Sequence, residues 1–178
     1  MQIAIITTVP DLVKTTIRYS ILRQGEERDA VQFHVVDLRE FGEGNYRQVD
    51  DTPFGGGSGM VLMAGPMFKA IEHAFELVGG QDGTAVVYPN PQGEIWSDGV
   101  ATTLCDTERI IFICGHYKGI DQRVIQKYVT HEFSIGDFVV SAGELPALLM
   151  MDSIIRLVPG VLNSIESARS EERRVGKS

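Results

Sequence analysis

The amino-acid sequence predicts an α/β fold with a mostly parallel sheet and helices on both faces. Short apolar segments that are typical of strands alternate along the chain with segments of helical periodicity. Most of the strand-like segments are apolar at nearly every position, as expected of strands that are covered on both faces. Strands that alternate with helices favour a parallel sheet, because a parallel partner is reached only through a crossover connection.

The first third of the chain predicts a strand, a helix, a second strand and a long loop. Residues 1–8 form an isoleucine-rich apolar run. Pro10 opens a segment in which apolar residues recur at helical spacing, namely Leu12, Val13, Ile17, Ile21 and Leu22. Residues 31–37 alternate apolar and polar positions as a strand does. Residues 38–59 hold six glycines and show little periodicity, so they are predicted to be a loop.

The rest of the chain continues this alternation. Helices are predicted over residues 66–78, 120–129 and 144–158. Strands are predicted over residues 84–88, 109–114, 131–135 and 138–141. Five or six strands therefore belong to one sheet.

Length and composition indicate one ordinary globular domain. The chain has 178 residues, of which 43% are hydrophobic and 22% charged, so it can bury one sizeable core. No apolar stretch approaches the roughly 20 residues that cross a bilayer, and residues 1–8 lack the basic start of a signal peptide. We therefore expect a cytoplasmic protein with no membrane partner. Cys105 and Cys114 are the only cysteines and have no ligand-like spacing, so we expect neither a disulfide nor a metal site.

Charge and missing motifs exclude several functions. The net charge of −8 argues against binding nucleic acid through the summed field of the chain, so an RNA contact needs basic residues gathered at one site or a segment outside this chain. Residues 7–10 hold no glycine, which disfavours a dinucleotide-binding turn after the first strand. Residues 171–178 match a P-loop only at their end, and no nucleophile elbow of a serine hydrolase is present.

Three loops that contain glycine follow predicted strands, at residues 88–93, 114–121 and 135–146. Ligands of open parallel sheets bind at the carboxyl ends of the strands, where loops expose backbone groups. Glycine lets such a backbone approach a ligand closely or adopt a positive φ. Each loop alone is equally explained as a tight turn between a strand and a helix. Together, the three loops are predicted to wall one pocket.

Five motifs occur in a fixed order along the chain. They are VDDTPFGGGSGM at residues 49–60, PQG at 91–93, CGHYKGIDQRV at 114–124, SIGDFVVSAGELP at 134–146 and DSIIRLVPGVL at 152–162. In this order they resemble the bacterial tRNA (guanine-N1)-methyltransferase family of the SPOUT superfamily. The resemblance implies a SPOUT-type fold with a C-terminal trefoil knot, a homodimer, and S-adenosylmethionine as the methyl donor. It also implies the reaction, which is methylation of N1 of the guanosine 3′-adjacent to the anticodon of tRNA.

The same resemblance implies which residues bind the cofactor, most of them through backbone groups. They are Tyr88, Pro91, Gln92, Gly93, Gly115, Tyr117, Ile135, Gly136, Asp137, Phe138, Val139, Val140, Ala142, Gly143 and Pro146. Backbone N–H and C=O groups can recognise an adenine edge without charged side chains, while apolar walls exclude water. For Ile135, Val139 and Val140, packing in the core is an equal alternative.

For catalysis, the resemblance implies Arg156 and Glu171. Guanine N1 carries a proton that must leave, and Glu171 falls at the position of the family's acidic residue, where it would act as the base. Arg156 would orient the guanine and polarise its O6. The alternatives are an ion pair between Arg156 and Asp152, and Glu171 as one charge in a solvated tail. His116 and Lys118 stand where many relatives carry Arg or His and Glu, so either cation could meet phosphate or the cofactor carboxylate, and a requirement for Mg²⁺ is left open.

The resemblance also divides the chain. Residues 1–168 are predicted to be the SPOUT methyltransferase catalytic domain and residues 169–178 a tail or shortened linker, with the C-terminal tRNA-binding domain absent. We therefore expect this chain to methylate its tRNA substrate weakly or not at all. Arg39 and Arg47 on the long loop are expected to contact tRNA phosphate. Two alternatives are a cofactor-binding dimer without catalytic activity, and a SPOUT methyltransferase that acts on another RNA site.

Overall fold

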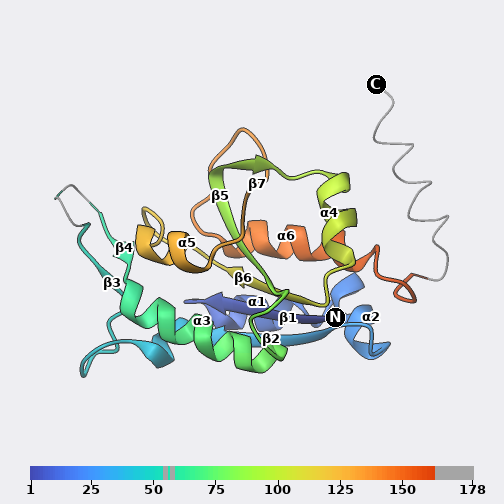
Figure 1. Ribbon diagram of the computed structural model, residues 1–178, viewed down its shortest axis with the longest axis horizontal. Coiled ribbons are helices and arrows are strands. Elements are labelled where there is room, and N and C mark those ends of the chain that lie inside the picture. Colours follow the sequence, from blue (N-terminus) through green and yellow to red (C-terminus); the bar gives the residue numbers. More distant parts are fainter. Residues whose placement is uncertain (54–55, 57–58, 163–178) are drawn as a thin grey trace.

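A five-stranded parallel sheet forms the centre of the molecule (Figure 1). The computed structural model describes residues 1–53, 56 and 59–162. The strand order is β2-β1-β6-β5-β7, and every neighbouring pair runs parallel, which confirms the predicted fold class. The strands are β1 (Gln2–Thr7), β2 (Gln32–Asp37), β5 (Ala85–Ile95), β6 (Arg109–Ile113) and β7 (His131–Ser134).

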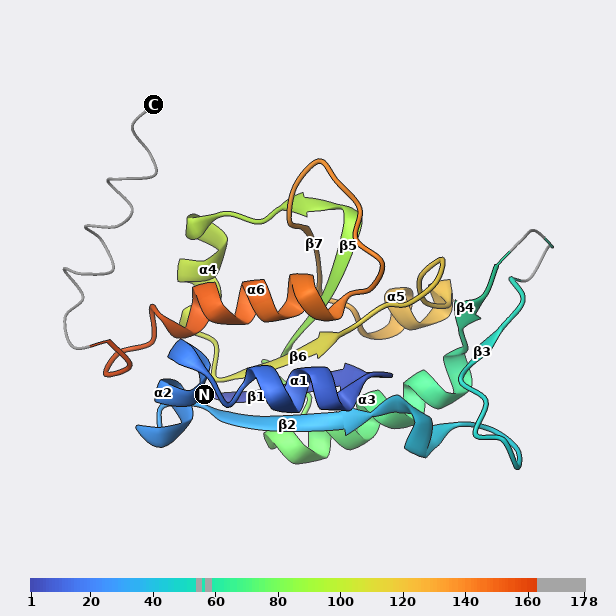
Figure 2. The same ribbon diagram turned by 180° about the vertical axis from the view of Figure 1, so that it is seen from behind.

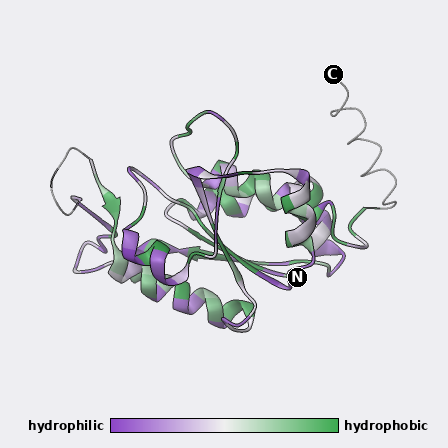
Figure 3. Cartoon of the chain, turned by 45° about the horizontal axis from the view of Figure 1, so that its top comes forward, coloured by the Kyte–Doolittle hydropathy of each residue, from purple (hydrophilic) through white to green (hydrophobic). Residues whose placement is uncertain are grey.

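Helices cover both faces of this sheet (Figures 1 and 2). One face carries α1 (Pro10–Thr16), α2 (Ser20–Glu27), α4 (Asp98–Cys105) and α6 (Glu144–Ile155). The other face carries α3 (Ala64–Val78) and α5 (Gln122–Tyr128). Hydrophilic and hydrophobic residues are mixed along the helices (Figure 3), as expected of helices with one buried side.

Each face of the sheet has its own buried core. Along β1, Ile3 and Ile5 belong to one cluster, whereas Ala4 and Ile6 belong to the other. Successive side chains of a strand point to opposite faces. Because both faces are covered, every position must be apolar, which explains the unbroken apolar run at the start of the chain.

The helix that was predicted to start at Pro10 and run past Ile21 is two helices. The first ends at Thr16, and the second begins at Ser20, which has a left-handed φ of 52°. A left-handed residue cannot continue a right-handed helix, so the chain changes direction there. Ile17 and Ile21 still pack into the same buried cluster, which is why their spacing suggested one continuous helix.

The stretch predicted to be a long loop contains some regular secondary structure. It begins with a 3-10 helix, η1 (Leu38–Phe41), whose N-terminus is capped by the Asp37 side chain. Farther along, β3 (Asp50–Asp51) pairs antiparallel with β4 (Val61–Leu62). Residues 54–55 and 57–58 lie outside the described part of the chain.

Two other segments differ from their predictions. Residues 138–141 form no strand, because Gly136, with a φ of 146°, turns the chain away from the sheet before this apolar run begins. Without a neighbouring strand, the backbone N–H and C=O groups of residues 138–141 cannot form the hydrogen bonds of a sheet. Helix α4 was not predicted, although the Ser97 side chain caps it by accepting from Val100 N at 3.4 Å.

Within the described residues, no helix has both the length and the apolar character that crossing a bilayer requires. The trefoil knot implied by the resemblance stays a prediction, and residues 163–178, which include the proposed tail, lie outside the described part of the chain.

Candidate active site

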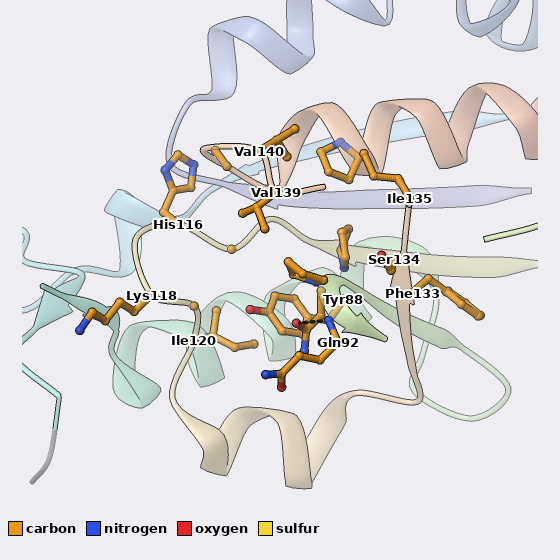
Figure 4. A pocket seen from close by; sticks show the side chains of 18 of the residues that line it. Tyr88, Gln92, His116, Lys118, Ile120, Phe133, Ser134, Ile135, Val139 and Val140 are labelled. Carbon is orange, nitrogen blue, oxygen red and sulfur yellow. Dashed lines mark hydrogen bonds between the residues drawn. The ribbon is translucent and has the colours of Figure 1, made fainter. Parts of the chain in front are cut away.

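A pocket of about 430 Å³ lies where three loops meet beside β5, β6 and β7 (Figure 4). Its volume is within the range of small-molecule sites. The walls come from residues 88–92 of β5, from residues 115–125 after β6, and from residues 133–146 around the end of β7. These walls are the three glycine-containing loops that were predicted from the sequence to wall one pocket. The fold brings them to one side of the sheet.

The first wall is a bulge within β5. Pro89 pairs with Phe133 of β7, and Glu94 pairs with the same Phe133, so residues 90–93 are looped out opposite one residue. Proline has no backbone N–H for a ladder and is typical of such breaks. The strand was predicted to end before Pro89, whereas it resumes after the bulge and runs to Ile95.

Polar contacts fix the shape of this bulge. The Asn90 side chain accepts from Gln92 N at 3.1 Å and donates to Glu132 Oε2 at 2.6 Å (Figure 4 shows the contact with Gln92). Gly93 then passes so close to β7 that a Cβ there would collide with the Glu132 backbone. The pocket edge at Gln92 is therefore held by contacts that a larger residue at position 93 would disrupt.

The second wall wraps around the buried Tyr88 ring. A Cβ on Gly115 would lie 2.9 Å from Tyr88 Cε2, and one on Gly119, which has a φ of 116°, would lie 3.1 Å from the hydroxyl oxygen. Burial raises the pKa of Tyr88 and the Glu132 charge raises it further, against a smaller lowering by a hydrogen bond from the Ile120 backbone. The phenol is therefore protonated at neutral pH.

The third wall is the loop between β7 and α6. Ser134 Oγ donates to Gly136 O at 3.0 Å and closes the turn that starts this loop. Phe138 and Val139 line the pocket although their exposed fractions are 58% and 78%. Apolar side chains this exposed at the mouth of a pocket are available to cover a ligand.

The second and third walls touch through their backbones. Gly143 N donates to Gly115 O at 2.8 Å, and His116 and Ala142 form an isolated antiparallel bridge beside this bond. A Cβ on Gly143 would lie 2.7 Å from Gly115 N and 3.0 Å from Cys114 Cα. Backbone atoms cannot move away as a side chain can, so this crossing requires glycine at position 143.

The two-stranded sheet is attached to the second wall. Leu62 N donates to Gly119 O at 3.0 Å. Burial raises the pKa of Tyr117, a hydrogen bond with Asp50 raises it further, and the Arg39 charge opposes this. The protonated hydroxyl of Tyr117 therefore ties the pocket to the strand that contains Asp50.

The pocket wall carries two cationic or potentially cationic side chains, His116 and Lys118, and no carboxylate among its described lining residues (Figure 4). The Lys118 stem packs on Gly59, where an added Cβ would lie 2.9 Å from Lys118 Cε. A ligand with a negatively charged group therefore meets no repelling carboxylate in this lining.

A buried carboxylate lies directly behind this wall. Glu144, the first residue of α6, is 1% exposed. Its Oε1 accepts from Thr7 Oγ1 at 2.6 Å and lies 2.8 Å from His116 Nε2. Burial by itself raises the pKa of Glu144, but the hydrogen bonds from His116 and Thr7 and the attraction of the His116 charge outweigh it, so the pKa is lowered.

Comparison with known proteins assigns the family. The family described as tRNA (Guanine-1)-methyltransferase TrmD matches residues 1–175. The chain belongs to this family. Among curated relatives, the tRNA (guanine-N(1)-)-methyltransferase of Christiangramia forsetii is 46% identical over 171 residues, which are 96% of this chain and 74% of that protein. The protein of the same name from Clostridioides difficile is 40% identical over 171 residues, with the same two coverages.

A solved structure of the family has the same fold. The crystal structure of tRNA (m1G37) methyltransferase from Aquifex aeolicus superposes with a TM-score of 0.82 at 35% sequence identity, and the match covers 92% of this chain and 72% of that one. The similarity to the SPOUT methyltransferase family predicted from the five motifs is therefore confirmed at the level of sequence and fold.

Most of the residues predicted to bind the cofactor line the pocket. They are Tyr88, Pro91, Gln92, Gly115, Tyr117, Ile135, Phe138, Val139, Val140, Ala142, Gly143 and Pro146. Three do not line it, namely Gly93, Gly136 and Asp137. Gly93 and Gly136 shape the turns that carry lining residues. The roles of all fifteen stay predictions.

The lining also includes residues that were not predicted to bind the cofactor. Ser141 and Asn90 belong to the predicted loops, and His116 and Lys118 were considered only as cations. Ile125 of α5 had no signal in the sequence, because its exposure to the pocket depends on how α5 packs beside β5 and β6.

Of the two predicted catalytic residues, Arg156 does not line this pocket. Arg156 follows α6, ten residues after Pro146, which corresponds to about 15 Å along the helix at 1.5 Å per residue. Burial raises the pKa of Asp152, and the Arg156 charge opposes this rise, so the two side chains interact electrostatically. Glu171 lies outside the described residues, and its role as the base stays a prediction.

Proposed function

We propose that this chain transfers a methyl group from S-adenosylmethionine to N1 of the guanosine 3′-adjacent to the anticodon of tRNA. Membership of the tRNA (guanine-1)-methyltransferase family supports the reaction class. The names of relatives at 40% to 46% identity support tRNA as the substrate. The observation that carries the proposal is the pocket walled by three loops that contain glycine, since it offers a place for a nucleoside cofactor. We further propose that the reaction takes place in the cytoplasm.

The described residues fit S-adenosylmethionine. Apolar side chains such as Ile135 and Val140 can cover an adenine ring, and the backbone of the loop around Gly115 can pair with its edge. The cationic side chain of Lys118 suits the carboxylate of the methionine part. When bound, this cofactor supplies a methyl group on a positively charged sulfur, which needs alignment with its acceptor more than activation.

The acceptor side of the reaction needs two further contributions from the protein. Guanine N1 must lose its proton, and we propose Glu171 as the residue that takes it. Negative charge then builds on O6, and a guanidinium such as that of Arg156 would stabilise it. Since Arg156 lies about 15 Å along α6 from the pocket of its own chain, we propose that it serves the pocket of a second copy.

A homodimer is supported by an exposed apolar surface next to the pocket. Leu145 and Leu149 on α6 are 58% and 49% exposed, and Val9 and Leu12 at the start of α1 are also exposed. Helices α1 and α6 contact each other and lie side by side (Figures 1 and 2). Exposed apolar residues on two neighbouring helices are typical of a protein–protein interface.

Methyl transfer itself is tested with a tRNA transcript and cofactor carrying a labelled methyl group. We expect the label to appear as 1-methylguanosine at the position 3′ of the anticodon, and to be absent when that guanosine is replaced by adenosine. A label on a ribose 2′-oxygen or at another site would overturn the proposed target. Cofactor binding by calorimetry without transfer to any RNA, even after a C-terminal tRNA-binding domain is grafted onto this chain, would overturn the proposed catalysis.

The contribution of Arg156 from a second copy is tested by mixing two inactive variants. Arg156→Ala removes the guanidinium, and Val139→Asp places a carboxylate at the exposed mouth of the pocket. If Arg156 serves the partner's pocket, random mixing forms heterodimers with one complete site and recovers about a quarter of the wild-type activity. If each chain uses its own Arg156, the mixture stays inactive.

A further inference from the structure

Glu144 is a charged residue in a place where packing alone would favour an apolar one. It is 1% exposed at the start of α6, between the end of β1 and the pocket wall. A buried carboxylate costs several kcal/mol unless it is paired and hydrogen-bonded. Both conditions are met here, since Thr7 donates at 2.6 Å and His116 lies at 2.8 Å.

The hydrogen-bond pattern fixes which nitrogen of His116 carries a proton. Thr7 Oγ1 accepts from Val9 N at 2.9 Å, which leaves its own hydrogen for Glu144. An ionised carboxylate only accepts, and the pKa of Glu144 is lowered because the bonds from His116 and Thr7 outweigh the effect of burial. The contact with His116 is therefore donated by Nε2–H of the imidazole.

The other ring nitrogen of His116 is left for a ligand. The ring lines the pocket, and its side chain is 16% exposed (Figure 4). Within the described part of the chain, Nδ1 makes no hydrogen bond, whereas Nε2 is committed to Glu144. In the protonated form of an imidazole, Nδ1 also carries hydrogen and donates.

The groups that face the His116 ring leave Glu144 as its charge partner. Thr7 of β1 is neutral, and the Tyr117 ring lies 6.0 Å away in an edge-on arrangement. Burial and the charge of Glu144 raise the pKa of the Cys114 thiol well above its ordinary value, so this thiol is neutral as well. Lys118 adds a second positive charge to the same pocket wall.

We propose that Glu144 is a positioning residue that holds His116 as a cationic hydrogen-bond donor for an anionic oxygen of the RNA substrate. The inference rests on the proposed methyl transfer to tRNA. Two oxygens of the RNA have this chemistry, namely a phosphate oxygen and O6 of the guanine as N1 loses its proton. In either case the charge on His116 matters more than its ability to exchange a proton.

Substitution of His116 by arginine separates this role from that of a base, because arginine keeps the charge and cannot accept a proton at any working pH. We expect His116→Ala to lower kcat/KM for tRNA about 100-fold, and His116→Arg to lower it by less than about threefold. The ratio of the wild-type rate to that of H116R should depend on pH, because arginine keeps its charge at every working pH. An inactive H116R would overturn the proposal.

Glu144→Gln keeps an oxygen for Thr7 and His116 but removes the charge. We expect kcat/KM to fall about tenfold, while affinity for S-adenosylmethionine changes little in calorimetry. In the background of H116R, Glu144→Gln should lower kcat/KM much less, since arginine needs no carboxylate to stay charged. Additive losses in the double variant would show that Glu144 does not act through His116.

Thr7→Val is the matched control, because it removes the other hydrogen bond to Glu144 Oε1 and leaves the charge pair. We expect a smaller loss than for E144Q and an unchanged pH profile. A T7V profile that matches that of E144Q would mean that packing, and not charge, is responsible. Should E144Q fail to fold, H116R and T7V still decide the question.

The separate effects of H116A on kcat and on KM identify which RNA oxygen His116 contacts. A phosphate contact predicts that H116A raises KM and lowers the slope of log affinity against log salt by about one. A contact with O6 predicts that H116A lowers kcat and leaves the salt dependence unchanged. Wild-type protein that forms no 1-methylguanosine would contradict the proposed function, whereas unimpaired H116A would contradict only this inference.

Discussion

The two sides of the central sheet are built in different ways. On the side of β2, β1 and β6, strands pair without interruption, with six consecutive pairs between β1 and β2 and five between β1 and β6. On the side of β5 and β7, pairing breaks at Pro89 and resumes at Glu94, and the adjoining loops hold glycines with positive φ. Among the described residues, six of the twelve buried isoleucines lie in β1 and β6 of the regular side and none lies in β5 or β7, whereas the irregular side carries the pocket.

This difference shows where each kind of residue matters. The stability of the regular side depends on the volume of its buried side chains, because its backbone N–H and C=O groups already form hydrogen bonds between neighbouring strands. The irregular side depends on backbone conformation and on positions with no side chain at all. Truncation of side chains should therefore damage the first region most, and addition of a single Cβ should damage the second.

The largest effect on stability is expected for truncation in the regular half. Phe112 of β6 is fully buried, so Phe112→Ala should lower the free energy of unfolding by about 3–5 kcal/mol in urea titration. The exposed Lys69→Ala on α3 serves as the control and should change it by less than about 0.5 kcal/mol. A loss below about 1 kcal/mol for F112A would mean that side-chain volume does not hold this half together.

A single methyl group is expected to disrupt the loop crossing. Gly143→Ala places a Cβ 2.7 Å from Gly115 N, which should cost about 1–3 kcal/mol and lower cofactor affinity at least tenfold. Gly99→Ala in α4 is the matched control, since its nearest neighbour outside the adjoining residues is 3.8 Å away, and it should be neutral or stabilising by up to about 1 kcal/mol. Equal behaviour of the two variants would refute a special role for this crossing.

The pH dependence of stability should report the Glu144 contacts that join α6 to the end of β1 and to the loop after β6. Because the pKa of Glu144 in the folded protein is lower than its ordinary value of 4.5, its stabilising contribution is present above that value and is lost as the pH falls through the folded pKa. The advantage of the wild type over Glu144→Gln should therefore shrink in acid. Urea titrations of both proteins at pH 7 and in steps below 4.5 measure it, and a constant difference would contradict the assignment.

The smallest effect on stability is expected at the mouth of the pocket. Val139 is 78% exposed, so Val139→Ser should change the free energy of unfolding by less than about 0.5 kcal/mol. If Val139 covers the bound cofactor, affinity in calorimetry should still fall severalfold, up to about tenfold, which corresponds to 1.4 kcal/mol. An unchanged affinity would place the cofactor away from this loop.

Local patterns in the sequence determined the parallel α/β fold, most strand positions, and the three loops that line the pocket. Apolar runs reveal the repeat of a strand or helix, and glycines mark positions where φ can be positive. Both signals depend on a few neighbouring residues. The same reasoning failed where a local pattern had no partner, as at residues 138–141, whose apolar run has no strand beside it. It also failed at Ser20, because nothing in the spacing of Ile17 and Ile21 reveals a left-handed residue between two helices.

Only the tertiary structure decided which distant residues meet. Thr7 and Glu144 are 137 positions apart, and His116 comes from a third segment, yet one carboxylate joins them. Such a contact depends on the order of strands in the sheet and on where α6 begins above it, which no local pattern encodes. The same reason explains why Arg156 could be singled out in the sequence although its distance from the pocket of its own chain could not.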